Sequence, residues 1–115
     1  MPLVKLYGKA RHLEEADEIR RIIAEELSCP MPDGSDGTIN PDTGVDLFAY
    51  NVSGSGVDDC HMTADLLIEI EAKNYPERVA NRKQRGDWIK ARAGALFGDT
   101  TVAVFLKTVD ADWCA

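Results

Sequence analysis

Apolar and polar residues alternate in two stretches of the chain, Leu3–Gly8 and Ala64–Lys73, as they do in β-strands with one buried face. The apolar face of these stretches carries Val4, Leu6, Ala64, Leu66, Ile68, Ile70 and Ala72. The opposite face carries Lys5, Tyr7, Asp65, Leu67, Glu69, Glu71 and Lys73. Residues 45–52 and 100–107 are two further apolar segments that we also interpret as strands. The pattern therefore predicts four strands.

Two further segments show the three- and four-residue spacing of apolar positions that is typical of amphipathic helices. The first covers about residues 13–27 and ends at the proline-containing segment 29–32, because proline cannot continue a helix. The second covers about residues 76–97. Its predicted buried stripe consists of Val79, Gly86, Ile89, Ala93 and Leu96. Residues 33–44, rich in Asp, Gly and Pro, are expected to form a long loop.

The predicted element order is βαβ followed by βαβ, within a single domain over residues 1–115. The two halves, about 1–52 and 64–107, can be aligned so that Leu3–Lys9 matches Leu67–Lys73. We expect a two-layer α+β fold in which two helices cover one face of a four-stranded sheet. The uncovered face would mix apolar and charged side chains. Such a face is suited to an oligomer that encloses a partly polar interior.

Composition and charge restrict the possible partners. The chain has 115 residues, which suffice for one modest core, and a net charge of −7, which argues against a nucleic-acid partner. No apolar run approaches the ~20 residues that cross a bilayer, so no membrane partner is expected. The three cysteines, Cys29, Cys60 and Cys114, are an odd number without CxxC spacing. We therefore expect a cytoplasmic protein with reduced thiols and no structural zinc.

Charge is unevenly distributed along the chain. Between Arg21 and Lys73 there is no Lys or Arg, whereas that stretch contains eleven acidic residues. An anionic ligand would therefore have to be bound by cations from outside this region, such as Lys5, Lys9, Arg11 or Lys73.

The candidate for chemistry is Pro2, which follows Met1 at the head of the first strand. Methionine aminopeptidases generally remove Met before a small residue such as proline, and removal would give Pro2 a free secondary amine. An α-amino group titrates near ~8, and burial lowers that value by disfavouring the charged form. A neutral amine near pH 7 is suited to act as a general base. The alternative is that Pro2 merely opens a strand.

Taken together, the Met1-Pro2 start before a strand, the two βαβ units in about 115 residues and a short tail containing Trp113 resemble the tautomerase superfamily. The segment 81–89, with Trp88, is also similar to the second helix of 5-carboxymethyl-2-hydroxymuconate isomerase. The resemblance implies a tautomerase-like fold, a homotrimer with a central channel and no metal or organic cofactor. It also implies that Pro2 is the catalytic base, acting on a small-molecule substrate such as an unsaturated keto acid.

The same resemblance suggests which cations bind substrate. Members of this superfamily commonly hold a substrate carboxylate with Arg or Lys near the proline, partly from a neighbouring subunit. Lys9 or Arg11 is similar in position to such an arginine, and Lys73 occupies the pseudo-symmetric place in the second half. The acidic loop 33–44 is a departure from this pattern, because it would repel an anion if it lay near the pocket. Hydrolytic dehalogenation and decarboxylation also occur in the superfamily and stay open as reaction types.

A second, non-catalytic interpretation remains. The βαββαβ order also describes ferredoxin-like binding modules, and a tautomerase-like chain can lose its activity. Other patterns are weaker. The cluster Asp58, Asp59, Cys60 and His61 has metal-ligand residue types, but we interpret it as a turn before a strand. His12 is expected to be exposed at a helix start.

Overall fold

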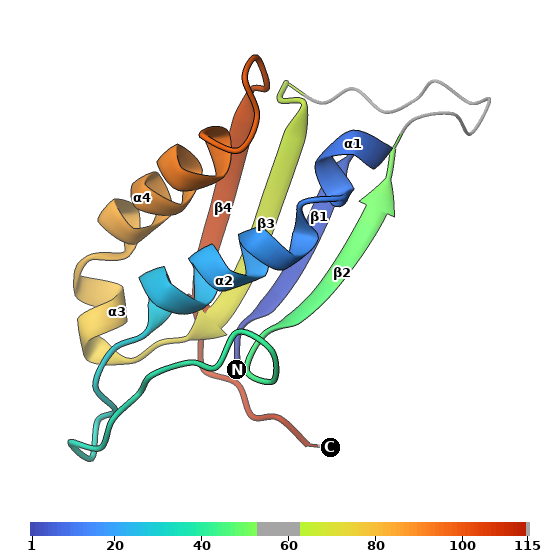
Figure 1. Ribbon diagram of the computed structural model, residues 1–115. Helices are drawn as coiled ribbons and strands as arrows, with labels where there is room; N and C mark the ends of the chain where they lie inside the picture. The colour runs from blue at the N-terminus through green and yellow to red at the C-terminus, as the bar shows by residue number, and fades with distance from the viewer. Residues whose placement is uncertain (53–62, 115) are drawn as a thin grey trace.

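The computed structural model describes residues 1–52 and 63–114, and within them the predicted α+β order is present (Figure 1). Strands and helices follow one another as β1 (Leu3–Gly8), α1 (Ala10–Leu13), α2 (Ala16–Leu27), β2 (Asp46–Asn51), β3 (Leu66–Lys73), α3 (Pro76–Ala80), α4 (Arg82–Gly94) and β4 (Val102–Val109). The chain has a two-layer α+β fold.

The four strands form one mixed sheet in the order β2-β1-β3-β4. β1 is parallel to β2, and β3 is parallel to β4, whereas the two central strands β1 and β3 are antiparallel. Each βαβ unit thus joins two neighbouring strands. In the ferredoxin-like fold another strand separates the two, so the ferredoxin-like alternative is wrong.

The register of the central pair relates the two halves by an approximate two-fold axis. Lys5 faces Glu69, Leu3 faces Glu71 and Tyr7 faces Leu67. A two-fold axis through the Lys5–Glu69 pair superposes Leu3 on Leu67, which is the alignment expected from the sequence. The same symmetry places the end of β1 and the end of β3 at opposite ends of the sheet.

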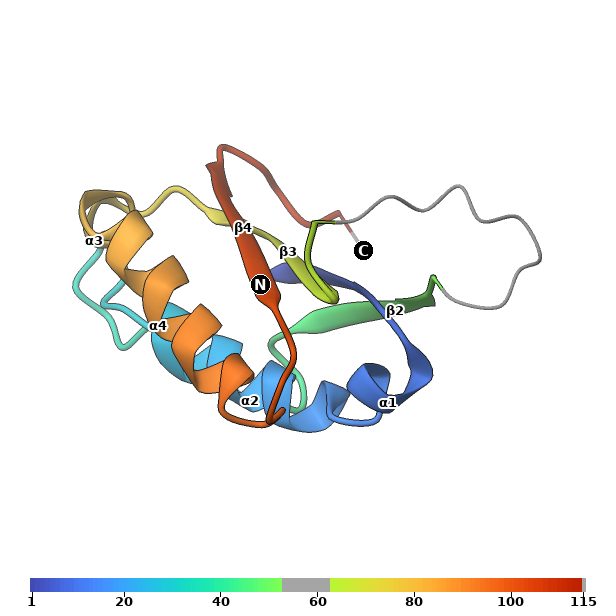
Figure 2. The same cartoon turned by 90° about the horizontal axis from the view of Figure 1, so that it is seen from above.

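All helices lie on one face of the sheet, as Figure 2 shows in the view along its edge. The strict alternation of burial in β1 and β3 sends every second side chain into this helix–sheet core. The fully buried side chains of the core include Val4, Leu6, Ile19, Ile23, Leu27, Leu66, Ile68, Ile70 and Ile89. Burial of each such side chain contributes about 1.5–3 kcal/mol, and the core therefore fixes the register of both central strands.

The helices differ from the prediction in detail. The expected helix 13–27 begins earlier and is divided into α1 and α2, and the expected helix 76–97 is interrupted at Asn81 between α3 and α4. Val79, predicted to be buried, is 41% exposed. The nearest atom that a Cβ on Gly86 would meet is Leu106 Cβ, at the ordinary contact distance of 3.9 Å. Gly86 is therefore not required by close packing.

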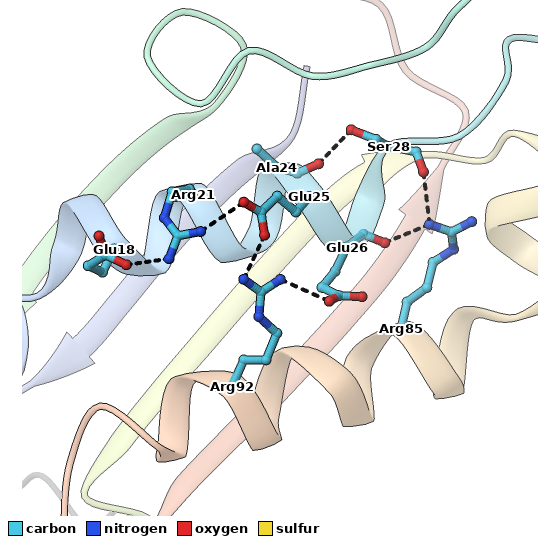
Figure 3. Close-up of polar contacts among 8 residues, drawn as sticks. All are labelled: Glu18, Arg21, Ala24, Glu25, Glu26, Ser28, Arg85 and Arg92. Carbon is cyan, nitrogen blue, oxygen red and sulfur yellow. Dashed lines mark hydrogen bonds and ion pairs between the residues drawn. The ribbon is translucent and has the colours of Figure 1, made fainter.

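Arginines, rather than apolar residues, form part of the contact between α2 and the α3–α4 segment (Figure 3). Arg78 and Arg85 are only 3% and 6% exposed. Arg85 Nη1 donates to the carbonyl oxygens of Glu26 (2.6 Å) and Ser28 (3.2 Å). Arg92 forms ion pairs with the side chains of Glu25 (2.6 Å) and Glu26 (2.9 Å). Arg78 and Arg85 satisfy carbonyl groups that the end of α2 leaves free, and all three cations match the negative end of its dipole.

His12 is completely buried, which contradicts its predicted exposure. Its Nδ1 accepts a hydrogen bond from the backbone N–H of Lys9 (3.2 Å), and its Nε2 lies 3.2 Å from Thr100 Oγ1. The ring also packs edge-on against Phe97, with the centroids 5.2 Å apart. Because Nδ1 is an acceptor, the buried ring is neutral and carries its proton on Nε2.

The face of the sheet away from the helices carries aromatic and charged side chains in rows across the strands. One row is Phe48, Lys5, Glu69 and Phe105. Phe48 and Phe105 are 52% and 59% exposed. In the next row Tyr7 and Tyr50 stack with their ring centroids 5.1 Å apart. This open face is therefore a mixed apolar and polar surface, as expected from the alternation.

Candidate functional site

A cavity of about 190 Å³ lies at the end of the sheet where β1 begins and β3 and β4 end. It is lined by Met1, Leu3, Glu71, Ala72, Lys73, Val109, Ala111, Asp112 and Trp113. Side chains two positions apart on a strand point to the same face of the sheet. The open face that carries Lys5 and Glu69 therefore also carries Leu3, Glu71 and Lys73. The cavity thus opens toward the face that the helices leave uncovered.

Pro2 stands directly before β1 and is one of the fully buried residues of the chain. Its carbonyl oxygen accepts a hydrogen bond from the backbone N–H of Asp46, at 3.0 Å, which ties it to the start of β2. A proline within a peptide chain has no backbone N–H to donate to a neighbouring strand, so it is tolerated at the start of a strand, where Pro2 stands. Met1, which precedes it, lines the cavity and is 47% exposed.

Lys73 ends β3 and lines the same cavity as Met1. Its Nζ lies 3.6 Å from a carboxylate oxygen of Asp112, whose side chain is 88% exposed. An exposed pair of this kind contributes about 0–1 kcal/mol, so a ligand carboxylate can replace Asp112 at the ammonium group. The second carboxylate of the cavity, Glu71, is paired with Lys107 at 2.9 Å.

Arg78 lies behind Lys73 and was not recognised as a site residue from the sequence. Its Nη1 donates to the carbonyl oxygen of Lys73 at 3.0 Å, and its Nε and Nη2 donate to that of Leu27 at 3.2 and 2.7 Å. One sequence signal could have revealed it. Arg78, Arg85 and Arg92 recur every seven residues, which places them on one side of the helical segment.

The electrostatic environment at the start of the chain disfavours a positive charge. Burial lowers the pKa of the Met1 α-amino group below its ordinary value, and Arg78 and Lys73 lower it further, while Asp46 acts in the opposite direction. An amine at this place is therefore neutral in a larger fraction of molecules than an exposed one would be at the same pH.

Lys9 and Arg11 lie at the other end of β1. Lys9 follows the last residue of the strand, and Arg11 is in α1, where it forms an exposed ion pair with Asp99 at 3.6 Å. The strand has six residues. Pro2 and Lys9 are seven positions apart, so at ~3.3 Å per residue they lie about 23 Å from each other within one chain. The structure brings Lys73 to the cavity beside Pro2 but does not bring Lys9 or Arg11 there.

The tail after β4 passes the N-terminus (Figure 1) and contributes three residues to the cavity. The indole Nε1 of Trp113 donates a hydrogen bond to the carbonyl oxygen of Met1 at 2.9 Å. Loop 33–44, which the sequence suggested as a source of repulsion, contributes none of the lining residues found in the described part of the chain.

Other candidate features do not form sites in residues 1–52 and 63–114. No group of three or more His, Cys, Asp or Glu side chains there is arranged to hold a metal ion. The cluster Asp58, Asp59, Cys60 and His61 lies outside the described residues. In loop 33–44, Asp33 and Asp36 accept hydrogen bonds from Ser35 and Thr38 in local turns. No helix in the described part of the chain combines the length and apolar character needed to cross a membrane.

Comparison with solved structures confirms the tautomerase-like fold. The chain is similar to the macrophage migration inhibitory factor-like protein of Entamoeba histolytica, with a TM-score of 0.54 and 10% identity over 94% of this chain and 88% of that one. It is also similar to Leishmania major MIF2 (TM-score 0.52, 15% identity, 98% and 93% covered). A third similar structure is malonate semialdehyde decarboxylase (TM-score 0.54, 10% identity, 97% and 88% covered). No protein-family model and no curated protein sequence matches the chain.

Proposed function

We propose that the protein is a tautomerase-like isomerase in which Pro2, exposed as an N-terminal amine by removal of Met1, acts as general base on a keto–enol substrate. The observation that carries the proposal is the complete burial of Pro2 between Met1 and Leu3, which both line the cavity that Lys73 also lines. Burial and two nearby cations already lower the pKa of an amine one residue before Pro2. The same factors would keep the Pro2 nitrogen neutral near pH 7.

In the proposed reaction, Pro2 nitrogen takes a proton from the carbon next to a carbonyl group. The electron pair of that C–H bond forms the C=C bond, and the carbonyl π pair moves to oxygen. The proton then returns to the oxygen or to another carbon of the conjugated system, so the net change is an isomerisation. A positioned base of this kind typically supplies 10²–10⁴-fold of rate.

Lys73 is the proposed anchor for a substrate carboxylate. It lines the cavity, and its exposed partner Asp112 is readily displaced. The substrate class is therefore a small 2-oxo or enol acid. Reaction needs no metal or organic cofactor, because a neutral secondary amine requires no further activation.

We further propose a homotrimer in the cytoplasm. The open face of the sheet exposes Phe48 and Phe105 beside Lys5 and Glu69, a combination suited to contact between subunits around a wet channel. Lys9 and Arg11 then bind substrate only if they come from a neighbouring subunit. Light scattering should give the mass of three chains. A monomer would refute the assembly and would leave Lys9 and Arg11 without a route to Pro2.

The decisive experiment compares two forms of one preparation. Protein released from an N-terminal fusion so that it begins at Met1 is divided, and one half is treated with methionine aminopeptidase until intact mass shows complete loss of Met1. The treated half should ketonise phenylenolpyruvate, and the untreated half should not, because the amide nitrogen of its Pro2 is not basic. Equal activity of the two halves would contradict the assignment of Pro2.

A second experiment uses the variant Pro2→Ala, which needs a structural control. Because the Pro2 ring is fully buried, its removal also loses packing. The processed variant retains a primary amine and should lose at least about 10-fold of the rate at unchanged oligomeric mass. If every mass-verified form is inactive on enols, the vestigial, ligand-binding alternative takes the place of the enzyme.

A further inference from the structure

The indole group of Trp113 is positioned as a hydrogen-bond donor beside Pro2. Trp113 lies in the tail after β4, lines the cavity with Lys73 and is 51% exposed. Its Nε1–H donates to the carbonyl oxygen of Met1 at 2.9 Å. That oxygen is two bonds from the Pro2 nitrogen, across the peptide bond that links the two residues. The donor therefore points to a position immediately beside the nitrogen proposed as base.

Removal of Met1 takes away the acceptor but not the donor. The C–N bond to Pro2 is the bond that is hydrolysed, and the carbonyl oxygen leaves with Met1. Trp113 Nε1–H is then left at the cavity without its partner from Met1. In the chain that retains Met1, this carbonyl oxygen is the acceptor of the Trp113 N–H.

We propose that Trp113 Nε1–H binds the carbonyl oxygen of the substrate and stabilises the enolate that forms when Pro2 takes the α-proton. The inference rests on the proposed function of Pro2. A ketone that enters the space left by Met1 with its α-hydrogen facing the Pro2 nitrogen has its oxygen two bonds from that α-carbon, on the side of the cavity where the Trp113 donor lies. Negative charge develops on this oxygen in the transition state, where a donor already in place is most effective.

The assignment distinguishes Trp113 from a merely apolar wall. Trp113→Phe keeps an aromatic ring and removes the N–H. In the processed chain the hydrogen bond to Met1 no longer exists, so the variant loses no contact with that residue. A buried oxyanion donor supplies about 10²–10³-fold in kcat, and for the half-exposed Trp113 we expect a loss of about 10–100-fold with phenylenolpyruvate.

A second measurement reports the hydrogen bond without turnover. The chain contains two tryptophans, so ¹⁵N-labelled protein gives two indole N–H resonances, which Trp88→Phe and Trp113→Phe assign. Trp88 is on α4, on the helical side of the molecule, and is the internal control. The probe is benzoylformate, a 2-oxo acid with no hydrogen on its α-carbon. It should shift the Trp113 resonance in the processed protein, leave that of Trp88 in place and shift neither in protein that retains Met1.

The outcomes separate the two proposals. Normal turnover in processed Trp113→Phe, or no movement of the Trp113 resonance at any benzoylformate concentration, would overturn the donor assignment while Pro2 stays the base. Movement of the Trp113 resonance in a processed protein that is inactive on enols would refute the proposed function and support Trp113 as a donor to a bound oxo ligand.

Discussion

Arg78 connects three parts of the chain through one buried guanidinium group. It donates to the carbonyl oxygens of Leu27, at the end of α2, and Lys73, at the end of β3. Its Cζ also lies 4.9 Å from the ring centroid of Tyr75. Replacing Arg78 by Met keeps an aliphatic stem but leaves both carbonyl groups without these donors.

The cost of Arg78→Met follows from these contacts. Each unsatisfied carbonyl group costs about 1–3 kcal/mol, and the lost cation–π contact adds about 0.5–1 kcal/mol. Part of this is recovered, because burial of the guanidinium, which lowers the pKa of Arg78, is itself unfavourable. We expect the free energy of unfolding to fall by about 2–4 kcal/mol.

Urea unfolding at a fixed protein concentration measures the change, since the stability of an oligomer depends on concentration. With an m-value of about 2 kcal/mol/M, the midpoint should fall by about 1–2 M. The matched control is Arg82→Met on the same segment, where an exposed arginine donates a hydrogen bond of 2.6 Å to Thr108 Oγ1 and the expected loss is below about 1 kcal/mol. Equal losses in the two variants would refute the role assigned to Arg78.

Three further predictions follow from single contacts. Burial, and then Arg11, lowers the pKa of His12, so the stability that neutral His12 contributes is present above its ordinary pKa of about 6.5 and is lost as the pH falls below it. His12→Gln should flatten the change in unfolding free energy between about pH 7.5 and 5, and an unchanged slope would count against this. Asp112→Asn should lower the KM for phenylenolpyruvate about 2–5-fold by freeing Lys73, whereas a higher KM would contradict the role of Lys73. Gly86→Ala should raise the unfolding free energy by about 0.5–1 kcal/mol, because the added Cβ has room, and destabilisation would show that the helix cannot accept it.

The sheet was predictable because its determinants are local. Alternation in β1 and β3 assigned the two faces correctly, and the alignment of the two halves agrees with the approximate two-fold axis of the central pair. Strand limits moved by one or two residues; β4, for example, covers Val102–Val109 rather than 100–107. The first and last residues of a strand are set by its hydrogen bonds to the neighbouring strand, and the sequence of the strand alone does not specify these.

The errors concern residues whose partners are distant in sequence. His12 is buried because Thr100, 88 positions away, and Phe97 enclose its ring. Arg78 is buried because the end of α2, 51 positions earlier, needs donors. Charge and polarity make both residues resemble surface positions, so composition and periodicity alone assign them to solvent.

The candidate site was predictable only in part. The resemblance pointed to Pro2 together with Lys73, Lys9 or Arg11, but only the antiparallel pairing of β1 and β3 in the structure shows that Lys73 lies at the Pro2 end of the sheet and Lys9 at the opposite end. The hydrogen bond from Trp113 to Met1 depends on the path of the tail, which has no periodic pattern.

The central claim is that the amine of Pro2 is neutral near pH 7, and its titration tests this most directly. In mass-verified processed protein labelled with ¹⁵N-proline, Pro2 is the one proline of five whose nitrogen is an amine, so its NMR shift can be followed against pH. The account predicts an apparent pKa below the ~8 of an exposed α-amino group, matched by the ascending limb of kcat/KM for phenylenolpyruvate. A Pro2 pKa at or above ~8, or a rate that rises at a different pH, would contradict it.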